Sequence, residues 1–437
     1  MNKRKSLLML FTVLCLSMLL ILQLINVQDR TPSKPAGAAP EAAKPGKVEP
    51  DYSVNSLRVS VSLAEDEFAD LKRRTDRYVD EQNIDISLEN LPQDTQYSTL
   101  KRLSTLGEAP DIMLLDNSWI AEFAALGYLN PLDEFFSGEK QTGYLTSAIN
   151  QNKWNGYTWG VPKDVDPYVI IWNEQLAKSG KWEHSPANRD EMLAWNKEWM
   201  KPDQGMYGIY FDPDDYMAFL SIYSIFSGSI PEEGNPLKEA ANESILQPLQ
   251  NFLLPQETEW KGAVFAKNYP QPSAEFSPWD LLEKGKMAAI VTTLSQYRKH
   301  GSSAIKLGAL PISGNGKTPG SWLMGRSFAV SSRSANSAAA MNWIESVTSA
   351  DAQSQAWKLT GKLPSLLASY SSPQLRQEEQ YDSYAWLVQE GVTPPLSFDA
   401  AKREDMVREE GMRLSSGTID LKAYAMKLAE SDSSSDR

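Results

Sequence analysis

The order of strand-like and helix-like segments after residue 56 constrains the fold more than any other feature of the chain. Strict alternation of apolar and polar side chains predicts strands, and apolar residues at helical spacing among charged ones predict helices. The predicted elements are a strand over 57–63, a helix over 65–81, a strand over 84–88, a helix over 95–106, a buried strand over 109–116 and a helix over 120–126. Strands that alternate with helices predict an α/β fold with parallel units and helices on both faces of a sheet.

Length and composition narrow the class of protein further. A chain of 437 residues with 41% hydrophobic residues is too long for one ordinary core, so two domains or lobes are expected. The net charge of −13 argues against binding to nucleic acid or to anionic lipid surfaces. One cysteine, Cys15, and two histidines, His184 and His300, leave no disulfide and few soft metal ligands. We therefore expect neither a metal site nor a cofactor.

The first 28 residues predict a membrane segment. Three basic residues at positions 3–5 precede an uncharged apolar run over 7–27, which is long enough as a helix to cross a bilayer. The basic start favours the cytoplasmic side, so the bulk of the chain is expected outside the cytoplasm. Residues 1–28 are interpreted as a signal or, preferably, an uncleaved anchor on the outer face of the cell membrane.

Two other interpretations of residues 1–28 remain open. The segment could be cleaved and the protein secreted, although the small residues that suit a signal peptidase occur only at 36–38, well beyond the apolar run. Lipidation at Cys15 is the other, and the bulky Leu14 before it argues against a lipobox. Residues 29–54 form a linker rich in proline and alanine, expected to be extended, and the acidic tail over 431–437 is expected to be disordered.

Four segments stand out by their motifs and their order along the chain: Ala109-Pro110-Asp111-Ile112 through Pro131-Leu132-Asp133; Trp154 to Pro162 with Ile171-Trp172-Asn173; Leu282 to Ile290; and Gly325 through Gly361-Lys362-Leu363-Pro364. In this order they resemble the segments of bacterial extracellular solute-binding proteins of family 1, which include the maltose- and multiple-sugar-binding proteins. The departures from the family are Trp172 in place of the usual tyrosine and the missing lipobox.

The resemblance implies a two-lobed periplasmic-binding-protein type II fold with a hinge. Lobe 1 would comprise residues 55–165 and 325–372, and lobe 2 residues 166–324 and 373–430, with crossings near 165–168 and 325–331. It also implies a protein without enzymatic activity that captures a small polar solute, a mono- or oligosaccharide, outside the cytoplasm. Its partners would be the permease subunits of an ABC importer, and the lobes would close over the solute.

Candidate ligand-binding residues lie at the ends of predicted strands and at the crossings. Carboxylates and amides bind sugar hydroxyls, and aromatic rings pack on the apolar faces of a sugar. The candidates are Asp116, Asn117, Ser118, Trp119, Asp166, Tyr168, Asp215, Tyr216, Ser295, Tyr297 and Trp322.

Several alternatives remain open on the sequence. The run over 212–216 also fits a turn that caps a helix over 216–227, and Trp322 also fits packing beneath the hinge. A glycoside hydrolase would need two carboxylates at a fixed separation, and no motif isolates such a pair. An anchored module that senses a solute for a membrane signalling partner fits the anchor and linker as well as import does.

Overall fold

The computed structural model describes residues 56–228, 234–312 and 320–430. The predicted anchor over 1–28, the linker over 29–54 and the tail over 431–437 lie outside these described residues. Within the described ranges, no helix combines the length and apolar character that crossing a membrane requires.

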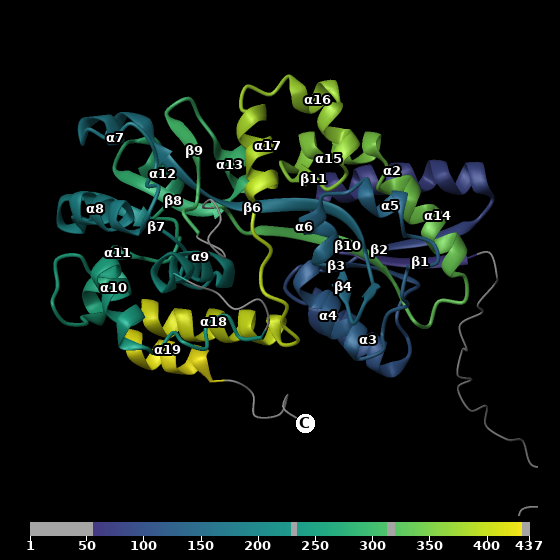
Figure 1. Ribbon diagram of the computed structural model, residues 1–437, viewed down its shortest axis with the longest axis horizontal. Helices are drawn as coiled ribbons and strands as arrows, with labels where there is room; N and C mark the ends of the chain where they lie inside the picture. Colours follow the sequence, from purple (N-terminus) through teal and green to yellow (C-terminus); the bar gives the residue numbers. More distant parts are fainter. Residues whose placement is uncertain (1–55, 229–233, 313–319, 431–437) are drawn as a thin grey trace, which may run out of the picture. The chain divides into compact units, whose positions relative to one another are not determined.

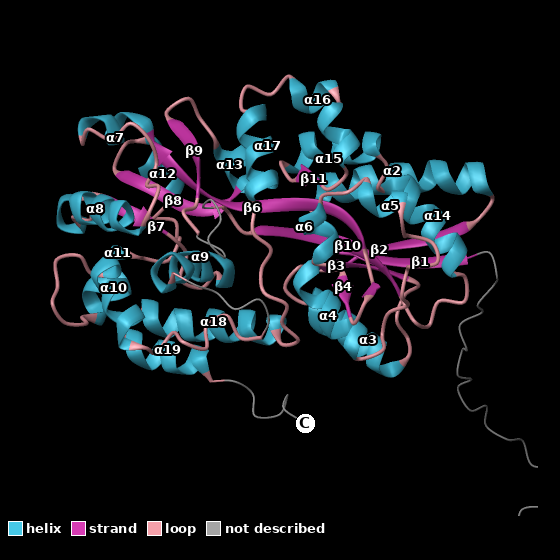
Figure 2. Cartoon of the chain, in the orientation of Figure 1, coloured by secondary structure: helices cyan, strands magenta, loops and turns pink. Residues whose placement is uncertain are grey.

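A mixed sheet organises the described residues (Figures 1 and 2). Its strands are β1 (Ser56–Val61), β2 (Asp85–Asn90), β3 (Ile112–Asp116), β6 (Val161–Asn173), β7 (Tyr207–Tyr210), β8 (Met287–Thr293), β9 (Ile305–Ala309), β10 (Leu323–Val330) and β11 (Leu363–Pro364). They lie in the order β2-β1-β3-β10-β6-β8-β7, and β9 and β11 also pair with β6. Strand β1 is parallel to both β2 and β3, which confirms the parallel units predicted from the sequence.

Helices cover the sheet and connect its strands (Figure 2). In the first half they are α2 (Glu65–Gln82), α3 (Gln96–Leu106), α4 (Asn117–Ala125), α5 (Glu139–Thr142), α6 (Thr146–Asn150), α7 (Glu174–Ser179), α8 (Arg189–Trp199) and α9 (Tyr216–Ser227). In the second half they are α10 (Glu243–Leu253), α11 (Gly262–Asn268), α12 (Pro278–Glu283), α13 (Leu294–His300), α14 (Ser337–Val347), α15 (Ala350–Thr360), α16 (Pro373–Arg376), α17 (Tyr381–Glu390), α18 (Ala400–Ser415) and α19 (Leu421–Ala429). Short 3-10 turns lie at Pro202–Gln204 and Leu367–Ser371, and β4 (Lys153–Trp154) and β5 (Tyr157–Thr158) form a separate hairpin.

Strand β6 links the two ends of the sheet. Its residues up to Pro167 pair with β10, and its residues from Tyr168 onward pair with β8 and β9. All 13 residues of this strand are buried. The change of partners falls at the position where the sequence predicts the first crossing.

Most of the second predicted crossing, over 325–331, lies in β10. This strand runs from Leu323 to Val330 between β6 and β3 and is antiparallel to both. Gly325 marks a close approach of two backbones, since an added Cβ would lie 2.4 Å from the carbonyl oxygen of Asp164.

The side chains of β3 alternate between two hydrophobic clusters. Ile112 and Leu114 join a cluster with β1 and α14, whereas Met113 and Leu115 join a cluster with α3 and α4. A third and larger cluster surrounds the second half of β6 and includes α9 and β8. Burial on both faces explains why this segment is apolar without interruption.

Two helix starts change the setting of several candidates. Helix α4 begins at Asn117, before the predicted start at residue 120, and α13 was not predicted from the sequence. Asp116 caps α4 by accepting from the backbone N–H of Ser118 at 2.9 Å, so residues 117–119 lie in the first helical turn and not in a loop. Thr293 caps α13 in the same way, so Ser295 and Tyr297 are helical. A cap residue already at the strand end removes the need for a connecting loop.

Candidate functional site

Three polar side chains form a row on one face of β6. Asp164, Asp166 and Tyr168 are two residues apart, the spacing that places side chains on the same face of a strand. They are only 4%, 6% and 7% exposed. Because a buried polar group is stable only when it is hydrogen-bonded, the partners of this row define the candidate site.

Asp166 joins β6 to the first turn of α13. Its two carboxylate oxygens accept from the backbone N–H of Ser295 at 2.9 Å and from the Ser295 hydroxyl at 2.6 Å. The ammonium group of Lys362 lies 2.6 Å from the second oxygen. The structure thus brings the predicted residues Asp166 and Ser295 into direct contact. Lys362 was missed as a site residue, although it lies in one of the segments that carry the family resemblance.

Tyr168 joins the same strand to α9. Its hydroxyl lies 2.9 Å from each carboxylate oxygen of Asp215. Asp215 also accepts from the backbone N–H groups of Met217 and Ala218, so it is the N-cap of α9 that the sequence allowed as one interpretation. Burial, followed by the charge of Asp215, raises the pKa of Tyr168 well above its ordinary value. This phenol remains protonated and donates to the carboxylate.

The first turn of α4 supplies the next polar group. The Asn117 side chain is 4% exposed, donates to Gln151 at 3.2 Å and accepts from the Ser327 hydroxyl at 2.6 Å. The Ser118 hydroxyl donates to the cap residue Asp116 at 2.7 Å. The three predicted residues 116–118 therefore form hydrogen bonds within the start of α4, with Ser327 of β10 and with Gln151 at the end of α6.

Glu404 of α18 faces this helix end. Its carboxyl group lies 3.4 Å from the Ser118 hydroxyl, and α18 and α4 lie side by side (Figure 1). Burial and then the charge of Asp116 raise the pKa of Glu404 to about 8, and burial also raises the pKa of Asp116. At neutral pH Glu404 is mostly protonated, so it can donate as well as accept. No sequence signal distinguished it from the other charges of 400–415.

A buried ion network lies at the other end of the row. The Asp164 carboxylate contacts the guanidinium of Arg326 and the ammonium of Lys163 at 2.9 Å, and both cations also contact Glu67 of α2. Burial alone would raise the carboxyl pKa values, but Lys163 and Arg326 outweigh it. They lower the pKa of Glu67 to about 2 and that of Asp164 far below its usual range. The sequence did not predict this network because its members are far apart along the chain.

Four of the predicted aromatic residues pack within or against the hydrophobic clusters. Trp322 is 1% exposed inside the largest core cluster, which is the packing alternative and not a platform open to a ligand. Trp119 packs against Tyr97 with ring centroids 5.2 Å apart. Tyr297 is 7% exposed, and its hydroxyl accepts from Gln380. Tyr216 is half-buried next to Asp215, close enough to α18 that Arg403 and Glu404 both influence its pKa.

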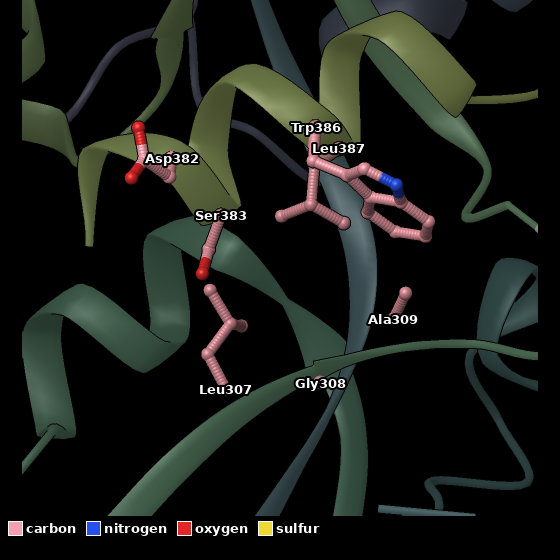
Figure 3. A pocket seen from close by; sticks show the side chains of 7 residues that line it. All are labelled: Leu307, Gly308, Ala309, Asp382, Ser383, Trp386 and Leu387. Carbon is pink, nitrogen blue, oxygen red and sulfur yellow. The ribbon is translucent and has the colours of Figure 1, made fainter. Parts of the chain in front are cut away.

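Cavities near the surface include two whose lining residues are defined. One of about 530 Å³ lies between the β4–β5 hairpin and the segment that leads into α18; its lining residues are Lys153, Trp154, Asn155, Gly156, Gly234, Leu396 and Phe398. The other, of about 290 Å³, lies between β9 and α17, where Trp386 extends over the strand beside Ala309 (Figure 3). Neither is lined by a predicted site residue.

The polar groups around β6 suit the binding of an uncharged solute with many hydroxyl groups. Carboxylates accept hydrogen bonds, Lys362 and Arg326 donate them, and Asn117 does both. Among the residues that the structure describes, no group of three or more histidine, cysteine or acidic side chains is placed to hold a metal ion.

The sequence matches the family described as "Bacterial extracellular solute-binding protein" over residues 74–382. The chain belongs to this family. Membership places this solute-binding protein outside the cytoplasm, and it agrees with the resemblance found in the four sequence segments. The curated relative "Maltotriose-binding protein" of Pyrococcus abyssi is 24% identical over 162 residues, which are 37% of this chain and only 32% of that relative.

Solved structures show the same α/β fold. The GacH receptor of Streptomyces glaucescens is 20% identical, with a TM-score of 0.65 over 86% of this chain and 96% of the receptor. The sugar-binding protein MalE of Xanthomonas citri is 16% identical, with a TM-score of 0.67 over 86% of this chain and 95% of that protein. The fold of this solute-binding protein is therefore that of the maltose-binding proteins, as the sequence predicts.

Proposed function

We propose that this solute-binding protein captures a short oligosaccharide between two lobes and delivers it to the permease subunits of an ABC importer. The observation that carries this proposal is the position of Asp166. This carboxylate lies where β6 changes partners, bound to Ser295 on the side of β8 and to Lys362 on the side of β11. A solute that hydrogen-bonds to Asp166, Ser295 or Lys362 would contact both proposed lobes at once. Its binding would therefore favour the state in which the two lobes are closed.

The distribution of the cores supports the two lobes over 55–165 with 325–372 and over 166–324 with 373–430. The clusters around β1 and α4 contain only residues of the first lobe. The largest cluster lies mainly in the second lobe, with a few residues of the first beside β6. Relatives support the choice of solute: one is named a maltotriose-binding protein, and a solved structure with the same fold holds mannotriose.

The groups described favour binding over catalysis. The Asp166 and Asp215 carboxylates are each held by several donors, an arrangement that fixes them as ligands for hydroxyl groups. We propose that the protein is not an enzyme. Incubation with a bound oligosaccharide should release no reducing ends, and release at a rate that depends on Glu404 would contradict this.

A thermal-shift screen against monosaccharides, polyols and linear hexose oligosaccharides tests the solute class. A ligand at 100 times its Kd should stabilise the protein by about 2.7 kcal/mol. Hexose oligosaccharides are expected to raise the melting temperature, and isothermal titration should then give one site per chain. Stabilisation by none of the saccharides would refute the proposed class.

We further propose that residues 1–28 hold the protein on the outer face of the membrane without cleavage or lipidation. Fractionation of cells should place the full chain with the membrane, and globomycin should leave its migration unchanged. Labelling of Cys15 by palmitate, or a secreted chain that begins beyond residue 36, would contradict attachment by this segment.

A further inference from the structure

The cavity beside the β4–β5 hairpin has two aromatic walls. Trp154 of the hairpin and Phe398 of the segment before α18 meet edge to face, with ring centroids 5.9 Å apart and an interplanar angle of 82°. Phe398 is 47% exposed, and Tyr157 on the neighbouring strand is 50% exposed. Large aromatic side chains rarely remain exposed together without a partner to cover them.

The walls are held rigidly, as a binding surface requires. Asn155 and Gly156 have φ values of 49° and 80°, which form the tight two-residue turn of the hairpin. On the other wall, the backbone N–H of Gly234 donates to the carbonyl of Leu396 at 3.0 Å. Phe398 is flanked by Ser397 and Asp399, whose side chains hydrogen-bond to each other.

Arg403 holds Asp399, the residue that follows Phe398. Its guanidinium pairs with Asp399 at 2.6 and 2.9 Å, and its side chain is 5% exposed. The ring of Phe398 is therefore presented by a fixed backbone, and its exposure is not the result of a loose loop. Little conformational entropy is lost when a ligand covers such a ring.

The cavity continues the candidate site outward. Trp154 packs against the same hydrophobic cluster as Trp119 of α4, and Phe398 lies two residues before α18. One wall therefore packs beside α4 and the other leads into α18, and these two helices meet at Ser118 and Glu404. A linear solute that occupies the contact between these helices can extend along both walls.

We propose that this cavity is an additional subsite for a further hexose ring of a linear oligosaccharide. The inference rests on the proposed function and specifies its substrate class as a chain of several sugars. The apolar face of the sugar ring would cover Phe398 and Trp154, and its hydroxyl groups would meet Asn155 and Lys153. The cavity of about 530 Å³ falls within the usual range of ligand pockets.

The test is isothermal titration of wild type and Phe398→Ala with maltose and mannose oligosaccharides of two to six units. Wild-type affinity should rise about tenfold when the chain becomes long enough to reach the cavity. Phe398→Ala should abolish this rise and leave the affinity for the shortest bound oligosaccharide within about twofold. Phe398→Tyr keeps the ring and should retain the rise.

Trp386→Ala is the matched control, since Trp386 is 38% exposed in the unrelated cavity of Figure 3. It should bind all lengths as wild type does. Three results would overturn the subsite while the proposed function stands. Wild-type affinity could be independent of oligosaccharide length, Phe398→Ala could keep the increase in affinity with length, or Phe398→Ala could weaken the binding of oligosaccharides of every length equally. Failure of every saccharide to bind wild type would overturn the proposed function and the subsite with it. Far-UV circular dichroism verifies the fold of each variant.

Discussion

The hydroxyl group of Tyr168 lies 2.9 Å from both carboxylate oxygens of Asp215, which ties β6 to the N-terminus of α9. The same carboxylate caps the helix through two backbone N–H groups. One buried acidic group therefore holds a strand residue and a helix end together. This contact fixes the orientation of α9 relative to the strand that runs through the candidate site.

Tyr168→Phe should lower the free energy of unfolding by about 1 to 3 kcal/mol, because a buried carboxylate loses a hydrogen-bond donor without a replacement. Urea unfolding followed by circular dichroism measures the change. Tyr157→Phe is the control, since Tyr157 is half exposed and its loss of a hydroxyl should leave stability unchanged. Equal stability of Tyr168→Phe and wild type would show that the contact contributes nothing to the fold.

Asp166→Asn should weaken oligosaccharide binding by at least about tenfold. The substitution preserves shape but removes the charge that holds Lys362 and Ser295 in position. Isothermal titration measures the affinity. Asp70→Asn is the control, because Asp70 of α2 is 8% exposed and paired with Arg74 but belongs to no part of the candidate site. An unchanged affinity in Asp166→Asn would remove this residue from the solute contacts.

Glu404 should make stability depend on pH. Its pKa in the folded protein is about 8, above the ordinary value of 4.5, so the folded state holds the proton more tightly than the unfolded state does. The stabilisation is complete below about pH 4.5 and is lost as the pH rises through 8. The groups that act on Glu404 are Ser118 of α4, Asp116 at the end of β3, Asp215 at the start of α9 and Arg408 of its own helix. Glu404 in turn contributes to the raised pKa values of Tyr168 and Tyr216.

Glu404→Gln should therefore lose less stability than wild type between pH 5 and pH 9. Melting temperatures measured across this range test the difference between the two slopes. The exposed neighbour Glu409 provides the control, and Glu409→Gln should follow the wild-type curve. Parallel curves for Glu404→Gln and wild type would indicate that Glu404 is ionised in the folded protein at neutral pH.

Arg326→Met should destabilise the protein by about 3 to 5 kcal/mol, because it leaves the buried carboxylates of Glu67 and Asp164 with Lys163 as their remaining partner in the network. Urea unfolding at pH 7 measures the loss. Arg408→Met, in an exposed pair with Asp405, should cost less than about 1 kcal/mol. A small effect of Arg326→Met would mean that the network is hydrated and contributes little.

Much of the fold and part of the site could be predicted from local patterns. Alternation and helical spacing predicted β1, α2, β2 and α3 to within one or two residues, because these patterns depend on neighbours in the chain. The contact between Asp166 and Ser295 was not itself predicted. Ser295 was chosen because it follows a predicted strand, and Asp166 because it lies at the predicted first crossing. The cap at Asp215 followed from its residue type next to a helical pattern.

The sequence by itself determined the α/β class, the family and the polar residues at the strand ends, since each depends on local spacing or on short motifs. Only the tertiary structure decided which aromatic rings are buried and which are exposed. Trp322 lies in the core and Phe398 is exposed, although each directly follows a serine in the sequence. The same holds for Glu404, which is 286 residues from Ser118 in the chain and meets it through helix packing. Contacts between elements that are far apart in the sequence depend on how whole helices pack against each other and against the sheet. Local sequence patterns do not predict that packing.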